Sequence, residues 1–236
     1  YFESGKIIQA RESFTRTIGL DNKHGFAFYY QGIINENIME IDDAIVSYKQ
    51  ASEFTPEIED VYYRLGMLLY RTGDLKNAME PLRRFIIFEP DSLHVLETLG
   101  EIFMEEGRFS EAIDTYRRLK ISYPEKLDYN LNLGESFSQL KKWNEAIEVY
   151  EKILLFNDEN YAVMMKLGES YNTIGNYIKA GDIYTKIINC TTPTMEIYYN
   201  LALNFGNQGE YLSALLVFHE ALNLSPNDSK IKYQLA

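Results

Sequence analysis

The sequence predicts an all-α protein built from repeated helical hairpins. Three observations predict this fold class: small residues recur every 34 positions, apolar residues between them are spaced by three and four, and glycine or proline follows many of the apolar stripes. Spacings of three and four place side chains on one face of an α-helix. A fixed period of this length is typical of stacked repeats rather than of a domain with a single core.

Residues 93–126 are the clearest copy of the repeat. Their first half, which we name the A helix, has an apolar stripe formed by Leu96, Leu99, Gly100 and Phe103. Gly107 then permits a sharp reversal. The second half, the B helix, has a stripe formed by Phe109, Ala112, Ile113, Tyr116 and Leu119. Pro124 ends the B helix because proline lacks a backbone donor.

The same register extends along the whole chain. Small residues fill one position of the A helix: Gly32, Gly66, Gly100, Gly134, Gly168, Ala202 and Ala236. Alanine fills one position of the B helix seven times: Ala10, Ala44, Ala78, Ala112, Ala146, Ala180 and Ala214. At these two positions we expect the paired helices to approach closely. Met39 and Lys141 replace the turn glycine, and the connection at Met39 is expected to be tighter or partly helical.

This pattern resembles the tetratricopeptide repeat, in which a large residue, Leu-Gly, an aromatic, alanine, an aromatic and proline recur over 34 residues. The pentatricopeptide repeat, which binds RNA, is about one residue longer and would fall out of phase. The resemblance implies a right-handed α-solenoid of antiparallel helix pairs, a superhelix forming one domain. Its expected segments are the end of a truncated repeat at 1–24, the repeats 25–58, 59–92, 93–126, 127–160, 161–194 and 195–228, and the start of a further A helix at 229–236.

The chain opens in mid-repeat, so we expect it to be part of a longer protein. No signal peptide is visible at the start, and the single cysteine, Cys190, favours a reducing compartment. These features favour a cytoplasmic location. The net charge of −12 disfavours nucleic acid and anionic membrane surfaces as partners, and no run of 18 apolar residues predicts a membrane span.

Signatures of enzymes are missing from the sequence. The histidines, His24, His94 and His219, lie in different repeats without ligands at metal-binding spacing. No phosphate-binding loop or nucleophile elbow is present. We therefore expect no catalysis, no metal and no cofactor.

Charged residues on the B helices form a regular pattern. An acid precedes a base by four residues in five repeats: Glu12 and Arg16, Glu80 and Arg84, Asp114 and Arg118, Glu148 and Lys152, and Asp182 and Lys186. This order is favourable on a helix surface, at about 0.2–0.5 kcal/mol for each pair. We interpret these residues as a solvated outer face rather than as a basic ridge that binds a partner.

The A helices carry the candidate binding site. In proteins that resemble this one, their exposed side lines a concave groove that binds peptides. One position there gives Glu101, Glu135 and Glu169, and Glu97 and Glu105 lie one turn on either side of Glu101. Like charges four residues apart oppose helix stability by a few tenths of a kcal/mol. The hypothesis is an acidic strip that receives Lys or Arg side chains of an extended or helical partner segment. The alternative is that these glutamates only keep the protein soluble.

Aromatic and polar residues flank the strip at groove-side phases: Tyr63, Arg64, Tyr70, Asn132, Lys166, Tyr199 and Asn200. Exposed aromatics beside charges are typical of recognition surfaces, although half-buried packing residues share this pattern. By contrast, the register assigns Tyr48, Tyr116, Tyr150, Tyr184 and Trp143 to the core.

The sequence thus predicts a protein-interaction scaffold that binds a partner segment, with basic residues, in its groove. Two alternatives remain open. One is a structural array that assembles end to end through its open ends or onto another part of the same protein. The other is a non-catalytic arm that recruits substrates for a larger enzyme.

Overall fold

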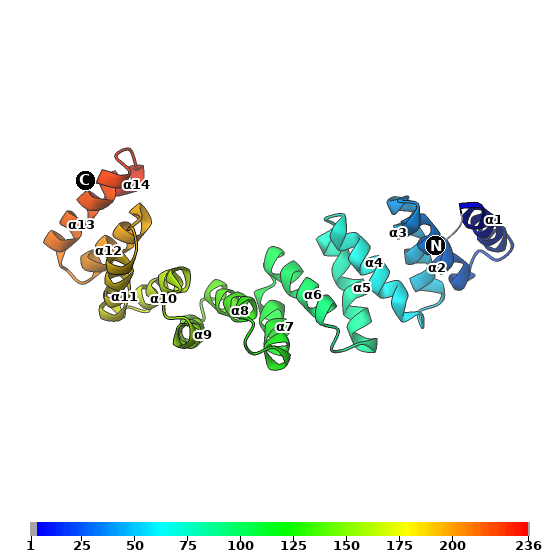
Figure 1. The fold of residues 1–236 in the computed structure, drawn as a ribbon, viewed down its shortest axis with the longest axis horizontal. Coiled ribbons are helices and arrows are strands. Elements are labelled where there is room, and N and C mark those ends of the chain that lie inside the picture. Colours follow the sequence, from blue (N-terminus) through cyan, green and yellow to red (C-terminus); the bar gives the residue numbers. More distant parts are fainter. Residues whose placement is uncertain (1–3, 236) are drawn as a thin grey trace. The chain divides into compact units, whose positions relative to one another are not determined.

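The structure, a computed structural model, describes residues 4–235 and contains helices and turns but no strand within that range. Chain contacts divide it into two compact units, Tyr1–Arg108 and Phe109–Ala236. The first unit contains α1 (Ser4–Leu20), α2 (Gly25–Asn37), α3 (Ile41–Phe54), α4 (Glu59–Arg71), α5 (Leu75–Phe88) and α6 (Leu93–Glu105). Each of these helices packs against the next along the chain (Figure 1).

The second unit repeats this arrangement. It contains α7 (Phe109–Ser122), α8 (Leu127–Gln139), α9 (Trp143–Phe156), α10 (Tyr161–Thr173), α11 (Tyr177–Cys190), α12 (Met195–Asn207), α13 (Tyr211–Leu224) and α14 (Ser229–Leu235). Here too each helix contacts its successor, and α10 also contacts α12. The all-α class predicted from the sequence is therefore confirmed. Ala236, the last member of the small-residue register, lies outside the described residues.

The close approach expected within the hairpins is present in α2–α3, α8–α9 and α10–α11. A methyl group built on Gly32, Gly134 or Gly168 would lie only 2.5–2.6 Å from the ring of the tyrosine on the following helix. Those rings belong to Tyr48, Tyr150 and Tyr184, each at most 1% exposed. Glycine is thus required because the partner ring occupies the space of a side chain. Tyr116 is also buried, so the assignment of all four tyrosines to the core is confirmed.

Trp143 differs from its prediction as a core residue. Its side chain is only half-buried, and it lines a cavity of about 280 Å³ on the A-helix side of the second unit. Trp143 is the first residue of α9, and the residues at the same position of α3, α5, α7 and α11 are half-buried as well, so this register position is not a core position.

The turn between the A and B helices uses a left-handed residue. Gly73, Gly175 and Gly209 have φ near 80°. Met39 and Lys141 adopt φ values of 64° and 58° at the same position. The prediction of a tighter or partly helical connection at Met39 is therefore wrong. The turn keeps the geometry of the glycine repeats, and Met39 adopts a left-handed backbone conformation that is unfavourable for a residue with a side chain.

Glycine at position 39 or 141 is expected to stabilise its unit. Met39→Gly and Lys141→Gly relieve a left-handed strain of about 1–2 kcal/mol, while the greater freedom of glycine in the unfolded chain returns about 0.5–1 kcal/mol. We expect a net gain of about 0.5–1 kcal/mol from each substitution in urea unfolding followed by circular dichroism. Gly73→Ala is the reverse control and should lose stability, since its φ is 81° and nothing lies within 4 Å to compensate.

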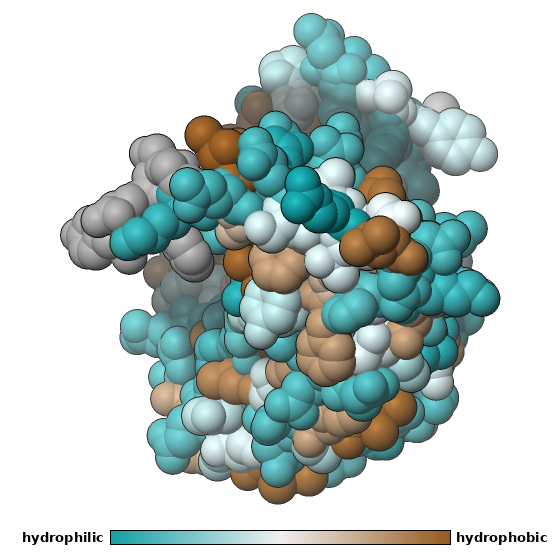
Figure 2. All heavy atoms as spheres, turned by 90° about the vertical axis from the view of Figure 1, so that its right-hand side faces the viewer, coloured by the Kyte–Doolittle hydropathy of each residue, from teal (hydrophilic) through white to brown (hydrophobic). Residues whose placement is uncertain are grey.

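Apolar residues at the α1 end of the first unit are scattered. Figure 2 shows brown side chains there in small groups among hydrophilic ones. Isolated exposed apolar residues are normal on protein surfaces and indicate no binding site by themselves.

Candidate functional site

The candidate site lies on the A-helix face, which we define as the side chains that link one A helix to the next. Four such links join residues 31 positions apart: Tyr29 with Asp60, Tyr70 with Glu101, Glu135 with Lys166, and Glu169 with Asn200. Equivalent positions in successive repeats are 34 residues apart. Each link therefore joins a residue to one that lies three residues, or about one helical turn, before its equivalent in the next repeat. Neighbouring A helices therefore pack with an offset of about one turn where these contacts form.

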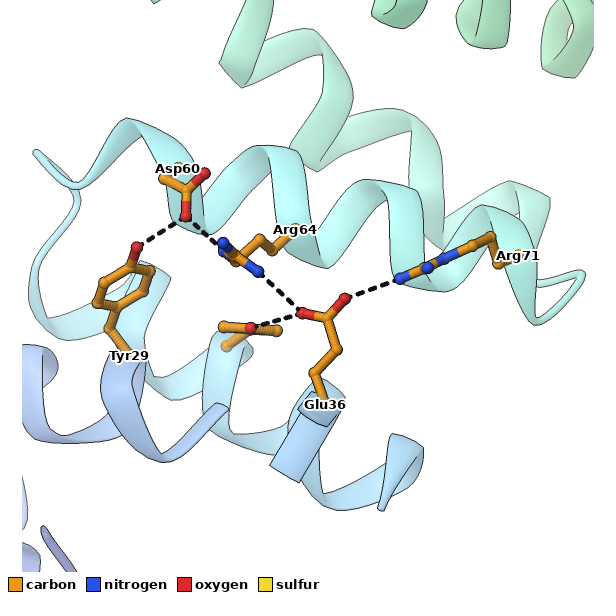
Figure 3. Close-up of polar contacts among 6 residues, drawn as sticks. Tyr29, Glu36, Asp60, Arg64 and Arg71 are labelled. Atoms are coloured by element: carbon orange, nitrogen blue, oxygen red, sulfur yellow. Dashed lines mark hydrogen bonds and ion pairs between the residues drawn. The ribbon is translucent and has the colours of Figure 1, made fainter. Parts of the chain in front are cut away.

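Glu36 is the centre of the links in the first unit (Figure 3). This residue near the end of α2 points its carboxylate at two arginines of α4. Arg64 Nη1 lies 3.2 Å from Glu36 Oε2, and Arg71 Nη2 lies 2.9 Å from Glu36 Oε1. Tyr48 of α3 donates its hydroxyl to Oε2 at 2.8 Å. Burial acts to raise the pKa of Glu36, but the hydrogen bonds from Tyr48, Arg71 and Arg64 outweigh it, so the pKa is lowered.

Asp60 closes the other side of this cluster. It accepts a hydrogen bond from Tyr29 at 2.7 Å and lies 2.5 Å from Nε of Arg64. Arg64 therefore bridges two carboxylates, one on its own helix and one on α2, as Figure 3 shows. Its charge is satisfied within the protein, whereas Arg71 keeps more than half of its side chain exposed.

The predicted glutamates of α6 lie at the edge of the first unit. Tyr70 of α4 donates its hydroxyl to Glu101 at 2.6 Å, and this bond raises the pKa of Tyr70 to about 12. Glu105 adds to this rise through its negative charge. Glu101 and Glu105 are exposed, and Glu97 is half-buried. The donor for Glu101 thus comes from the preceding repeat, and an analysis of spacing within one helix could not find it.

Glu135 and Lys166 form the corresponding link in the second unit. The ammonium of Lys166 on α10 lies 3.4 Å from the Glu135 carboxylate on α8. Both residues line the cavity of about 280 Å³, together with Trp143 and Glu169. The cavity therefore combines two carboxylates, one ammonium group and an indole ring.

Glu169 differs from Glu135 in having a neutral partner. Asn200 of α12 donates its amide to Glu169 at 3.3 Å. Desolvation by surrounding protein atoms and the negative charge of Glu196 raise the pKa of Glu169, although the residue as a whole is exposed. Lys166 and Asn200 counter this rise only in part.

Three further predicted site residues, Tyr63, Tyr199 and Asn132, are partly buried. The Tyr63 ring lies 5.3 Å from the Phe85 ring and is half-buried. The Tyr199 ring meets Phe218 edge to face at 5.8 Å and belongs to the core cluster under α13. Asn132 is half-buried, and its backbone carbonyl accepts a hydrogen bond from the Ser136 hydroxyl.

Sequence reasoning missed Glu36, Asp60 and Arg71 as members of the A-helix face. A signal was present: Arg64 and Arg71 are seven residues apart, so they share one face of a helix, and an acid lies near the end of the preceding A helix. The missing information was how neighbouring A helices sit on each other, because Glu36 meets arginines 28 and 35 residues further along the chain and no single spacing identifies both.

Two further observations limit the kind of site present. Among residues 4–235, no three or more His, Cys, Asp or Glu side chains are grouped so that they could hold a metal ion. Within the same range, none of the helices has the length and apolar character needed to cross a lipid bilayer.

Solved structures share this fold at low sequence identity. MamA matches with a TM-score of 0.63 at 22% identity, over 77% of this chain and 98% of MamA. PilF of Pseudomonas aeruginosa matches with a TM-score of 0.55 at 20% identity, over 92% and 98%. A chain of the Naa15/Naa10 complex bound to HypK-THB matches with a TM-score of 0.73 at 10% identity, over 94% and 35%. No curated protein sequence matches the chain significantly.

Sequence profiles of the tetratricopeptide repeat match three separate segments. They cover residues 60–92, 97–162 and 196–228, which together exceed half of the chain. Each segment follows the hairpin register described above. The chain therefore belongs to the tetratricopeptide repeat family, whose fold is a scaffold for protein interactions.

Proposed function

We propose that this scaffold binds a protein segment with basic residues along its A-helix face. The observation that supports it most directly is the cavity of the second unit, where Glu135, Glu169 and Trp143 surround a space large enough for a side chain. A guanidinium or ammonium group there would meet carboxylates and an aromatic ring, the combination that favours a bound cation. In this proposal the scaffold acts through binding alone, without catalysis.

The different partners of the two carboxylates support the same proposal. Glu135 already has Lys166 at 3.4 Å, whereas Glu169 has an amide partner and a raised pKa. A partner cation beside Glu169 would offset an electrostatic cost that the free protein carries. In the first unit, the exposed carboxylates of Glu101 and Glu105 offer further contacts for basic residues by the same chemistry.

Removing the two carboxylates is expected to weaken binding of a basic segment by about tenfold or more, and more strongly at low salt. The change is Glu135→Gln together with Glu169→Gln, which keeps side-chain size and the hydrogen-bond acceptor for Asn200. The probe is a set of 12-residue peptides selected on the protein from a displayed random library, with affinity measured by fluorescence anisotropy. We expect the selected peptides to be rich in Lys and Arg.

The control changes net charge equally on the opposite side of the second unit. Glu145 of α9 and Asp182 of α11 are exposed B-helix residues, so Glu145→Gln with Asp182→Asn should leave affinity unchanged. Equal loss from both double variants would show that only overall charge matters. Selected peptides without basic residues would refute the proposed partner chemistry.

A further inference from the structure

A second cavity, of about 600 Å³, lies on the B-helix side of the second unit. We name it the α7–α9 cavity. Helices α7, α8 and α9 supply its apolar lining: Ile121, Pro124, Leu133, Phe137 and Val149. Helices α7 and α9 supply its charged lining: Arg117, Lys120, Glu145 and Glu148. The cavity shares no residue with the smaller cavity of the A-helix face, so it is a separate feature of this unit.

Lys120 is unusual for its position in the repeat. The equivalent residues of the other B helices are all half-buried and uncharged: Ile18, Ser52, Ile86, Leu154, Ile188 and Leu222. Lys120 is half-buried too, so it brings a charge to a position that is otherwise mostly apolar. Burial and the positive charge of Lys152 lower the pKa of Lys120, and Glu148 opposes this only in part. The charged form of Lys120 therefore costs the free protein stability.

The two bases of the α7–α9 cavity have no acidic partner within the protein. Among residues 4–235, Lys120 forms neither an ion pair nor a side-chain hydrogen bond. The guanidinium of Arg117 lies 5.4 Å from the centre of the Phe137 ring, in a cation–π contact. Glu148 is already paired with Lys152 at 2.5 Å. An excess of positive charge thus surrounds an apolar cavity, although the net charge of the chain is −12.

We propose that the α7–α9 cavity binds a partner segment in which an apolar side chain stands next to an Asp or Glu. The apolar side chain packs on Leu133 and Val149, which are buried at the base of the cavity. The carboxylate pairs with Lys120 and offsets the cost of its burial. This partner is acidic, whereas the segment proposed for the A-helix face is basic, and the two sites can act independently.

The equivalent cavity one repeat later provides an internal comparison. It measures about 570 Å³ and lies among α9, α10 and α11. Leu154 stands there at the position of Lys120, and Glu151 at that of Arg117. Its two lysines already have acids within 4 Å: Lys152 has Glu148, and Lys186 has Asp158. This cavity offers apolar surface without an unpaired base, so we expect the acidic segment to prefer the α7–α9 cavity.

Peptide selection on the whole chain tests this proposal. A displayed library of random 12-residue peptides is selected on the variant Glu135→Gln with Glu169→Gln, which does not favour basic peptides on the A-helix face. We expect the selected peptides to combine Leu, Ile or Phe with Asp or Glu. Adding Lys120→Leu should weaken their binding at least tenfold in fluorescence anisotropy. It should also raise the urea midpoint of the protein, because α9 carries leucine at this position, so misfolding would not explain the loss.

Lys76→Leu is the matched control. Lys76 is an exposed residue of α5 in the first unit, and its replacement changes the net charge by the same amount. It should leave the affinity of the selected peptides unchanged. Selected peptides without acidic residues overturn the proposal. An equal effect of the two lysine variants, or no effect of Lys120→Leu, overturns it as well.

Labelled cysteines locate the bound peptide. On a Cys190→Ser background, an environment-sensitive dye is attached to Ile121→Cys or to Leu155→Cys; the native Cys190 is exposed and must be removed. The two positions are equivalent in their repeats, and their side chains are 82% and 81% exposed. Peptide binding should change the emission of the dye at position 121 and leave that at position 155 unchanged. Any other pattern overturns the assignment to the α7–α9 cavity.

Discussion

Replacing Gly134 by alanine is expected to cost the second unit about 2 kcal/mol of unfolding free energy. The added Cβ would lie 2.5 Å from Cε1 of Tyr150, closer than side chains pack. Tyr150 is 1% exposed, so its ring has no free space into which it can move. The helices of the hairpin must separate instead, which loosens the core on both sides.

The fluorescence of Trp143, the only tryptophan, reports this change because the residue begins the helix that contains Tyr150. Urea unfolding followed by this signal should shift to lower denaturant. Gly206→Ala in α12 is the control: nothing lies within 4 Å of its added methyl group, and alanine favours a helix by up to about 1 kcal/mol. If both substitutions stabilise the unit, the close-packing role of Gly134 is refuted.

The helices could be predicted from the sequence because the repeat is local. Small residues and apolar stripes decide where each helix forms and which side it buries, and both lie within one 34-residue period. The buried Tyr48, Tyr150 and Tyr184 follow from the same register. A fold can be predicted from its sequence when the local signals for each helix agree with the packing of the whole array, as they do in this chain.

The links between repeats were harder to predict because they depend on how one hairpin sits on the next. Glu101, for example, has no basic residue one turn away on its own helix. The contacts of Glu101, Glu135 and Glu169 with Tyr70, Lys166 and Asn200 arise from the one-turn offset between adjacent A helices. Met39 and Lys141 illustrate a second limit: the turn imposes its left-handed backbone even where the residue does not favour it.

Replacing Glu36 by glutamine is expected to destabilise the first unit by about 2 kcal/mol at pH 7. The substitution removes the charge that Arg64 and Arg71 share, and only about a fifth of the Glu36 side chain is exposed. The lowered pKa gives the pH dependence. The carboxylate stabilises the unit fully above its unfolded pKa of about 4.3, and this contribution is lost as pH falls through the lower folded pKa.

The experiment compares wild type and Glu36→Gln by urea unfolding, followed by circular dichroism, at pH 7 and at pH 3. The difference between the two proteins should be largest at pH 7 and shrink at pH 3. These values avoid the region around the isoelectric point of about 4.8, where the protein carries little net charge. A difference that does not depend on pH would show that the hydrogen bonds of Glu36 matter but its charge does not.

Glu169→Gln provides the matched comparison with the opposite sign. The folded pKa of Glu169 is raised, so its ionised form costs stability above that pKa, and the cost disappears as pH falls below the unfolded value. Glutamine keeps an acceptor for Asn200 and removes the charge, so stability at pH 7 should stay within about 0.5 kcal/mol of wild type or rise. The two glutamates therefore differ: Glu36 joins neighbouring repeats of its unit, whereas the ionised form of Glu169 costs its unit stability, a cost that a partner's cation would offset under the proposed function. A loss of stability from Glu169→Gln as large as that from Glu36→Gln would contradict this division and weaken the proposed binding role.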